Sequence, residues 1–177
     1  MTFNSVQGIT IPEGLATQIK LDNNILWKVS GGYTNILPFA TDTDRKTVYQ
    51  GKGYITGYRL SSSGNLSQAT GMCASGFIFP VKEGDVLRIK GIKPKASTAS
   101  YVISYNNSNT KVAHKGFLQE TDGSSWVSNN IATYDKTNDI LTIILSSTNF
   151  GTGWDSIRFS AGTIDGNTIV TINEKIV

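Results

Sequence analysis

The sequence has 177 residues and a mass of 19.1 kDa, which suits one domain, with or without a short appendage, but not two full domains. Hydrophobic residues make up 38% of the chain and charged residues 16%, with a formal net charge of +3. This balance excludes an intrinsically disordered chain, which would combine low hydrophobicity with high net charge. The scarcity of helix-forming surface residues argues against a helical protein. The basic residues are spread along the chain, so we expect no nucleic-acid partner.

Residues 1–31 look separate from the rest of the chain. Two apolar segments, 16–21 and 25–29, flank a polar loop at residues 22–24 whose residue types tolerate positive φ and favour a hairpin. A lone hairpin is marginally stable in water, so its apolar side chains need cover from the main domain or from another subunit. We therefore expect residues 1–31 to form an attachment or assembly element and residues 32–177 to form the main domain.

The rest of the chain consists of short runs rich in β-branched and aromatic residues, separated by Gly, Asn, Asp and Ser, which is typical of strands and turns. The runs span residues 53–60, 76–81, 85–92, 100–105, 139–145, 154–160 and 168–172. No window carries the spacing of a capped amphipathic helix. We therefore expect an all-β fold, an antiparallel jelly-roll-like sandwich with a short N-terminal hairpin appendage. An up-and-down barrel is the main alternative.

Two of these runs predict how their strands are covered. In 154–160, Ile157 and Phe159 alternate with Arg158 and Ser160, which predicts a strand with one buried and one exposed face. The run 139–145 is apolar on both faces apart from one threonine, which predicts a central strand that is covered on both sides.

The chain has one cysteine and one histidine, which limits its chemistry. Cys73 excludes an intrachain disulfide and a cysteine-based zinc site, and its small neighbours favour a buried, inert thiol. His114 lacks the sequence context of a catalytic triad. We expect no cofactor. Calcium is the alternative, because carboxylates and loop carbonyls suffice for it, and residues 42–44 and 120–122 supply candidate ligand pairs.

Two loop regions combine aromatic and polar side chains as sugar binding requires, since flat rings stack on pyranose faces and polar groups reach the hydroxyls. Both tryptophans in these regions lie among Gly and Ser, which makes exposure more plausible than inside a strand, but capping of the ends of the core is the favoured interpretation and sugar stacking the alternative. An arginine on the strand that follows is a further candidate, for which a surface ion pair is favoured over ligand binding. The candidate ligand-binding residues are Trp126, Asn129, Asn130, Tyr134, Trp154, Asp155 and Arg158.

Glycoside hydrolysis needs two carboxyl groups about 5–5.5 Å or about 6.5–9.5 Å apart across a cleft. Most of the 13 acidic residues stand beside Gly, Asn or Thr, where turns account for them. We therefore expect a protein without enzymatic activity. A polysaccharide-degrading fragment is a third-ranked alternative.

Three stretches resemble modules of tail and baseplate proteins from phages and prophages of Gram-positive gut bacteria. They are 35–38 with 53–54 and 58–64, then 76–85 continuing to 89–91, and finally 156–160 with 168–174. The segment from residue 11 to residue 27 also resembles short connectors in such proteins. The resemblance implies a jelly-roll component of a virion or tail-like particle that is often multimeric and contacts cell-surface glycans. It transfers no binding residues.

From this resemblance we expect a non-catalytic receptor-binding module of a phage tail-like particle. A purely structural tail or baseplate subunit that contacts other proteins is the alternative. The expected partners are cell-surface carbohydrate of a bacterial host, other tail or baseplate subunits, and further copies in a homo-oligomer. No signal peptide and no bilayer-spanning apolar run is visible, so we expect synthesis in the cytoplasm and no membrane insertion.

Overall fold

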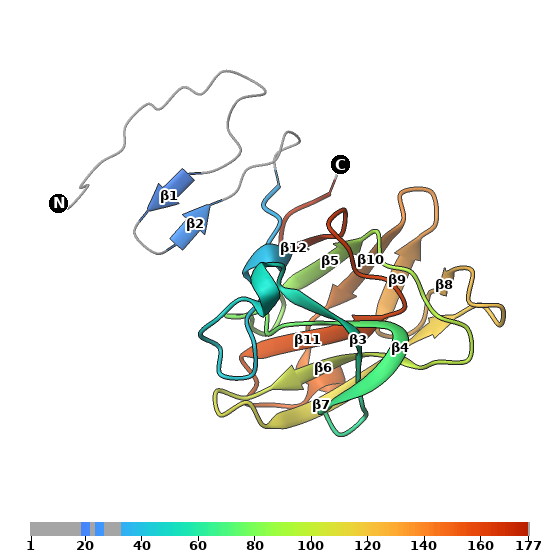
Figure 1. Ribbon diagram of the computed structural model, residues 1–177, viewed down its shortest axis with the longest axis horizontal. Coiled ribbons are helices and arrows are strands. Elements are labelled where there is room, and N and C mark those ends of the chain that lie inside the picture. The colour runs from blue at the N-terminus through green and yellow to red at the C-terminus, as the bar shows by residue number, and fades with distance from the viewer. Residues whose placement is uncertain (1–18, 22–23, 27–32, 177) are drawn as a thin grey trace, which may run out of the picture.

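The computed structural model describes residues 19–21, 24–26 and 33–176, and these are almost entirely β-structure (Figure 1). Helical structure in this part of the chain is limited to two 3-10 turns, η1 (Leu37–Phe39) and η2 (Tyr49–Gly51), and one helical turn, α1 (Ser147–Phe150). None of these is long or apolar enough to cross a membrane. The prediction of an all-β protein is confirmed.

Two short strands at the N-terminal end, β1 (Ile19–Leu21) and β2 (Asn24–Leu26), pair in antiparallel fashion. β1 lies within the predicted segment 16–21, and β2 begins one residue before the predicted segment 25–29, at a residue that the sequence assigns to the loop. The other residues of the predicted 1–31 attachment element lie outside the described residues, so its role stays a prediction.

Ten strands form two antiparallel sheets. The six-stranded sheet has the order β3-β4-β11-β6-β7-β8, and the four-stranded sheet has the order β12-β5-β10-β9. The strands are β3 (Tyr54–Leu60), β4 (Leu66–Ser75), β5 (Val86–Lys90), β6 (Ser100–Tyr105), β7 (Lys111–Gln119), β8 (Trp126–Val127), β9 (Ala132–Asp135), β10 (Ile140–Ile144), β11 (Ser156–Ala161) and β12 (Ile169–Ile172).

Two of the connections between the sheets of this sandwich are jelly-roll-like. The chain crosses from β4 to β5 and later returns from β10 to β11. The strands at both ends of these two crossings are neighbours, because β4 pairs with β11 in the six-stranded sheet and β5 pairs with β10 in the four-stranded sheet. An up-and-down barrel would keep sequence neighbours adjacent throughout, so that alternative is excluded.

The main core lies between the two sheets and follows the alternation of the strands. Leu87 and Ile89 of β5 face Ile157 and Phe159 of β11 across it, and all four are fully buried. Burying each such side chain contributes about 1.5–3 kcal/mol, so these alternating positions account for much of the driving force that joins the sheets.

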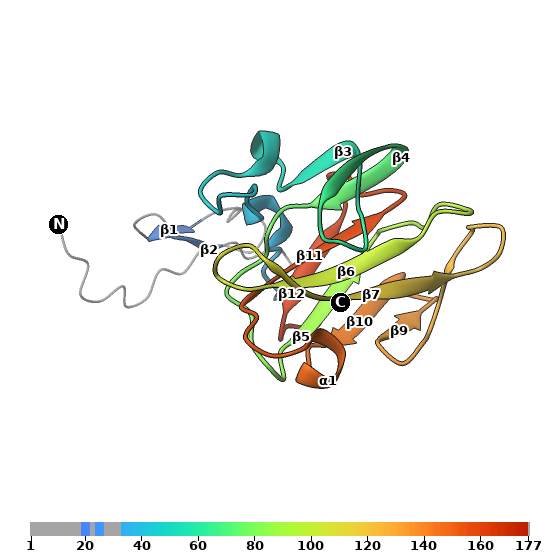
Figure 2. The same ribbon diagram turned by 90° about the horizontal axis from the view of Figure 1, so that it is seen from below.

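A second core lies on the opposite face of the six-stranded sheet. A register shift between Thr56 and Tyr58 marks a bulge in the β3–β4 hairpin, and bulges bend and twist the strands that carry them. The hairpin curls over β6 and β11, as Figure 2 shows, and its Leu60 packs with Ile103 and Tyr105. This part of the six-stranded sheet is therefore covered on both faces.

Two strand predictions need correction. Residues 76–81 form only isolated bridges, in which Phe77 pairs with Thr41 and Ile78 with Ile157, because the segment passes between sheets and Pro80 has no N–H for a ladder. The run 139–145 contains β10, which is central in its sheet, but Ile144 is 61% exposed. The prediction that this run is covered on both sides is therefore wrong.

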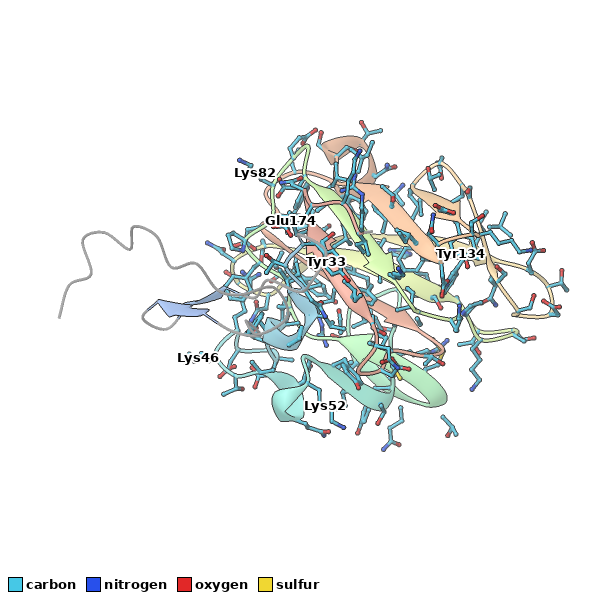
Figure 3. The ribbon with its side chains drawn as sticks, turned by 90° about the horizontal axis from the view of Figure 1, so that it is seen from above. Tyr33, Lys46, Lys52, Lys82, Tyr134 and Glu174 are labelled. Carbon is cyan, nitrogen blue, oxygen red and sulfur yellow. The ribbon has the colours of Figure 1, made fainter. Side chains whose placement is uncertain are left out.

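The outer face of the four-stranded sheet is covered at one end only. Tyr33 and Ile176 pack there against Ile140, with Ile169 beside them. The backbone N–H and hydroxyl of Thr34 both donate to the Glu174 carboxylate, which holds the first and last described segments of the domain together. Figure 3 shows Tyr33 and Glu174 side by side.

Candidate functional site

Trp126, the first predicted sugar-binding residue, is part of the core. Its ring is 3% exposed, and its indole N–H donates to the carbonyl of Ile92 at 2.9 Å. It packs edge-to-face against Phe117, with ring centroids 5.6 Å apart. Trp126 therefore caps the end of the sandwich core, which is the interpretation that the sequence favours, and its ring is not available to stack on a sugar.

The polar residues after Trp126 are mostly occupied by internal contacts. The Asn129 side-chain oxygen accepts two backbone N–H groups of the following turn, at 3.0 and 2.8 Å, and its amide donates to the carbonyl of Gly116. The Tyr134 hydroxyl donates to Asp139 at 2.8 Å, and its pKa is raised by burial and by that bond. Asn130 is exposed and has no side-chain hydrogen bond to the described residues.

Trp154 and Asp155 also have structural partners. Trp154 is half-buried, donates its indole N–H to the Gly151 carbonyl at 2.8 Å, and packs edge-to-face against Phe150. The Asp155 carboxylate forms an ion pair with Arg45 at 2.9 Å. These contacts hold the loop before β11 against the domain.

Arg158 is the clearest correction. It is 2% exposed, although the sequence predicts an exposed strand face for it. Its guanidinium donates to the Ser75 carbonyl at 3.0 Å and to the Tyr49 hydroxyl at 2.9 Å, and it lies 4.9 Å from the centroid of the Phe77 ring. The curled hairpin and the residues before it cover this face, which the strand's own alternation cannot reveal.

The predicted calcium ligands build turns. The Asp42 carboxylate accepts hydrogen bonds from the N–H of Asp44 and the hydroxyl of Thr47, which lower its pKa. The Asp122 carboxylate accepts the N–H of Ser124 at 2.9 Å. The described residues contain no group of three His, Cys, Asp or Glu side chains that could hold a metal ion.

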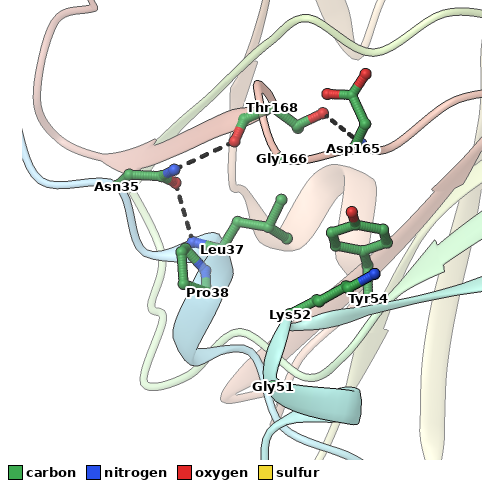
Figure 4. A pocket seen from close by; sticks show the side chains of 9 residues that line it. All are labelled: Asn35, Leu37, Pro38, Gly51, Lys52, Tyr54, Asp165, Gly166 and Thr168. Atoms are coloured by element: carbon green, nitrogen blue, oxygen red, sulfur yellow. Dashed lines mark hydrogen bonds between the residues drawn. The ribbon is translucent and has the colours of Figure 1, made fainter.

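A hollow of about 390 Å³ opens elsewhere, between residues 35–38, residues 51–54 and the turn at 165–168 (Figure 4). This volume lies at the lower end of the range for small-molecule sites. We call it the Tyr54 hollow. It is lined by Asn35, Leu37, Pro38, Gly51, Lys52, Tyr54, Asp165, Gly166 and Thr168.

Asn35 and Gly53 bring the walls of the Tyr54 hollow together. The Asn35 side-chain oxygen accepts the N–H groups of Leu37 and Val170, and its amide donates to the Thr168 carbonyl, so η1 is joined to β12. Gly53 has a φ of +75°, and a Cβ there would lie 1.7 Å from the Leu37 carbonyl oxygen. Only glycine lets the start of β3 approach η1 this closely.

Three polar groups at the Tyr54 hollow have unused hydrogen-bonding capacity. Tyr54 is 8% exposed, yet its hydroxyl has no hydrogen-bond partner among the described residues. The hydroxyl is directed toward the turn that carries Asp165 (Figure 4), and its pKa is raised first by burial and then by the Asp165 charge. One oxygen of Asp165 accepts the N–H of Asn167, whereas the other is unpartnered in this part of the chain. Lys52 is exposed and forms no ion pair with described residues.

This arrangement is suited to binding a polar ligand. The hollow offers a hydroxyl, an ammonium group and a carboxylate oxygen beside the apolar surfaces of Leu37 and Pro38. Its lining contains a single carboxylate, Asp165, so the pair of facing carboxyls that glycoside hydrolysis uses is not assembled there.

The predicted residues do not converge on this hollow. None of the seven lines it, and Figure 3 shows Tyr134 well away from Lys52. Lys52 and Asp165 carry no local signal, since an exposed lysine and a turn aspartate are common.

No family model, no curated protein and no solved structure matches this chain.

Proposed function

We propose that the protein is a non-catalytic carbohydrate-binding module and that the Tyr54 hollow holds one sugar unit of its ligand. The observation that carries the proposal is the convergence of three unpartnered groups, on Tyr54, Lys52 and Asp165, beside an apolar wall. A pyranose presents hydroxyls that both donate and accept, together with apolar C–H faces. This chemistry complements such a lining.

The state of Tyr54 gives the strongest support. The ring of Tyr54 is part of the core, whereas its side chain also lines the hollow and its hydroxyl has no hydrogen-bond partner among the described residues. A tyrosine combines an apolar ring with a polar tip, which suits it to a binding surface. A ligand hydroxyl placed between Tyr54 and Asp165 would accept from the phenol and donate to the carboxylate.

The setting that we propose is a phage tail-like particle, on the basis of the sequence resemblance. An open site of this size binds one or two sugar units weakly. Several copies on one particle can raise the overall affinity by on the order of 10²–10⁴ when they engage one surface together. Receptor binding at a bacterial cell surface would use this avidity.

Binding of the intact chain to immobilised bacterial cell-wall glycans, with and without two variants, tests the proposal. Tyr54→Phe and Asp165→Asn each remove hydrogen-bonding capacity and keep the shape, and each should weaken binding about tenfold, which corresponds to about 1.4 kcal/mol. Tyr58→Phe, a tyrosine on the same strand outside the hollow, is the matched control and should bind like the parent protein.

Two results would contradict the proposal. One is a folded protein that binds no glycan on a broad array, which would favour the alternative of a structural tail or baseplate subunit. The other is glycan binding that both hollow variants retain at full strength, which would place the sugar site elsewhere.

A further inference from the structure

The six-stranded sheet carries no carboxylate. Its strands contain five basic or imidazole side chains and not one Asp or Glu, and the five are Arg59, Lys111, His114, Lys115 and Arg158. Neither Lys111 nor Lys115 forms an ion pair with the residues that the structure describes. The strands of this sheet therefore carry net positive charge, which favours anions over cations as ligands.

An apolar and aromatic strip runs along β7 on the outward face of this sheet. His114 and Leu118 lie on that face, Tyr101 stands beside Gly116, and Val127 of β8 stands beside Leu118. The strip spans about 13 Å along the strand, at about 3.3 Å per residue. We call it the Tyr101 strip.

The curled hairpin leaves the Tyr101 strip uncovered. Leu118 is 52% exposed and Val127 is 36% exposed, and Tyr101 and His114 are half-buried. The rings of Tyr101 and His114 meet edge-to-face, with centroids 5.4 Å apart. Neither the Tyr101 hydroxyl nor a His114 ring nitrogen has a hydrogen-bond partner among the described residues.

Gly116 leaves open space in the middle of the Tyr101 strip. A Cβ at Gly116 would meet only one atom within 4 Å, the Ser100 carbonyl oxygen at 3.9 Å. The backbone there is not left-handed, so the glycine is not needed for conformation. The absence of a side chain beside Tyr101 creates a flat area next to an aromatic ring.

One lysine shares the outward face with the Tyr101 strip. Lys111 stands beside Tyr105 on that face, whereas Lys115 stands beside Val102, which is buried between the two sheets, so Lys115 lies on the opposite face of β7. The pKa of His114 is lowered first by burial and then by the charges of Lys111 and Lys115, which agrees with their closeness to the ring. A ligand that rests on the strip would meet the Lys111 ammonium group.

We propose that the Tyr101 strip is a second binding site, distinct from the Tyr54 hollow, for an anionic polysaccharide that carries phosphate or carboxylate groups. Sugar rings rest on Tyr101, Gly116 and Leu118, and the negative groups pair with Lys111. The aliphatic half of the strip favours the C–H faces of sugars over nucleobases, which stack on successive aromatic rings. The proposal does not depend on the function of the hollow.

The test measures binding of the full chain to matched polymers at low and physiological salt. Phosphorylated dextran and polygalacturonate distinguish phosphate from carboxylate recognition, dextran lacks the charge, and polyglutamate lacks the sugar ring. At least one anionic polysaccharide should bind at least tenfold more tightly than both dextran and polyglutamate. Its affinity should fall as salt rises.

Gly116→Val is the decisive variant, because it fills the space beside Tyr101 without backbone strain and should keep the fold. It should weaken binding at least tenfold with an unchanged circular-dichroism spectrum. Lys111→Gln should weaken binding and flatten its salt dependence. Lys82→Gln, at an exposed lysine outside this sheet, should leave binding unchanged.

Three outcomes would overturn the proposal. The first is full binding by folded Gly116→Val protein, and the second is equal binding of polyglutamate and the anionic polysaccharides, which would indicate charge attraction alone. The third is tighter binding of oligothymidylate than of any polysaccharide, which would assign the strip to single-stranded nucleic acid.

Discussion

The Arg45 guanidinium lies 2.9 Å from the carboxylate of Asp155 and joins two segments that are 110 residues apart in the sequence. The same guanidinium donates to the hydroxyl of Ser156 at 2.5 Å and to the carbonyl of Asn106, and it stacks over the ring of Phe77 at 5.2 Å. Asp155 is therefore the counter-ion of a structural arginine, so the carboxylate predicted to bind sugar is already in use.

Removal of the Arg45 side chain should destabilise the protein. Arg45→Ala leaves Asp155 without its counter-ion and Ser156 without a donor, and we expect a loss of about 2 kcal/mol, because Asp155 is partly solvated. Urea unfolding of the two proteins measures the difference. Lys46→Ala, at the exposed neighbouring position, should change stability by less than about 0.5 kcal/mol. Equal midpoints for Arg45→Ala and the parent would show that the ion pair contributes nothing.

Arg158 should tolerate replacement by an apolar side chain better than truncation. No carboxylate among the described residues pairs with it, so its burial is offset only by the Ser75 carbonyl, the Tyr49 hydroxyl and two aromatic rings. Replacing a buried charge with an apolar side chain of similar length is often nearly neutral, whereas truncation leaves a cavity. We expect Arg158→Met to be more stable than Arg158→Ala by about 2 kcal/mol in thermal or urea unfolding. The reverse order would show that the guanidinium itself is required.

Trp126 provides a way to separate stability from ligand binding. Trp126→Ala should cost about 3–5 kcal/mol because it empties a core position, so any loss of glycan binding in that variant would reflect unfolding. Trp126→Phe keeps the packing against Phe117 and loses the bond to Ile92, at a cost of about 1–2 kcal/mol. Glycan binding by folded Trp126→Phe should equal that of the parent. Asn130→Ala should change neither the free energy of unfolding nor glycan binding. A selective loss of binding in Trp126→Phe would restore Trp126 as a ligand residue.

The strands that the sequence predicts correctly are those whose own side chains alternate. In β5 and β11, buried aliphatic or aromatic residues alternate with polar ones, and Ser100–Tyr105 is predicted with the bounds that the structure has. β4 was missed because its centre, Ala69 to Gly71, is small and polar. Its burial comes at one end, where it pairs with β11, and that pairing is set by residues far along the chain.

The proposed binding surfaces could not be predicted from local patterns for the same reason. The Tyr54 hollow joins segments more than 100 residues apart, and the local sequence around Asp165 indicates only a turn. Trp126 caps the core because its Gly/Ser-rich loop folds back so that the ring reaches Ile92, a contact that no local pattern shows. Arg158 alternates correctly with Ile157 and Phe159, yet the curled hairpin buries the face that the alternation assigned to solvent.

His114 should titrate below its ordinary pKa of 6.5, because burial and the charges of Lys111 and Lys115 disfavour the imidazolium. The folded state then binds fewer protons than the unfolded state just below pH 6.5, so this group lowers stability as the pH falls through that region. Proton NMR of the single histidine measures the pKa directly. Lys111→Gln should raise it, whereas Lys82→Gln should not. A pKa at or above 6.5 would show that burial and the two lysine charges do not disfavour the imidazolium.

Tyr105 should make the fold sensitive to alkali. Its hydroxyl donates to the Gly64 carbonyl at 2.7 Å, and burial raises its pKa from 10 to about 12. Between these two values the folded state keeps a proton that the unfolded state has lost, so stability present below pH 10 is lost progressively as the pH rises toward 12.

Tyr105→Phe is less stable at pH 8, because it lacks the hydrogen bond to Gly64, but its stability should fall less steeply across this window. Urea unfolding at intervals from pH 8 to pH 11.5 measures how steeply the free energy of unfolding falls with pH in the parent and in Tyr105→Phe. Tyr58→Phe is the control, and its stability should fall as steeply as that of the parent. Parallel slopes for Tyr105→Phe and the parent would mean that another group sets the alkaline limit.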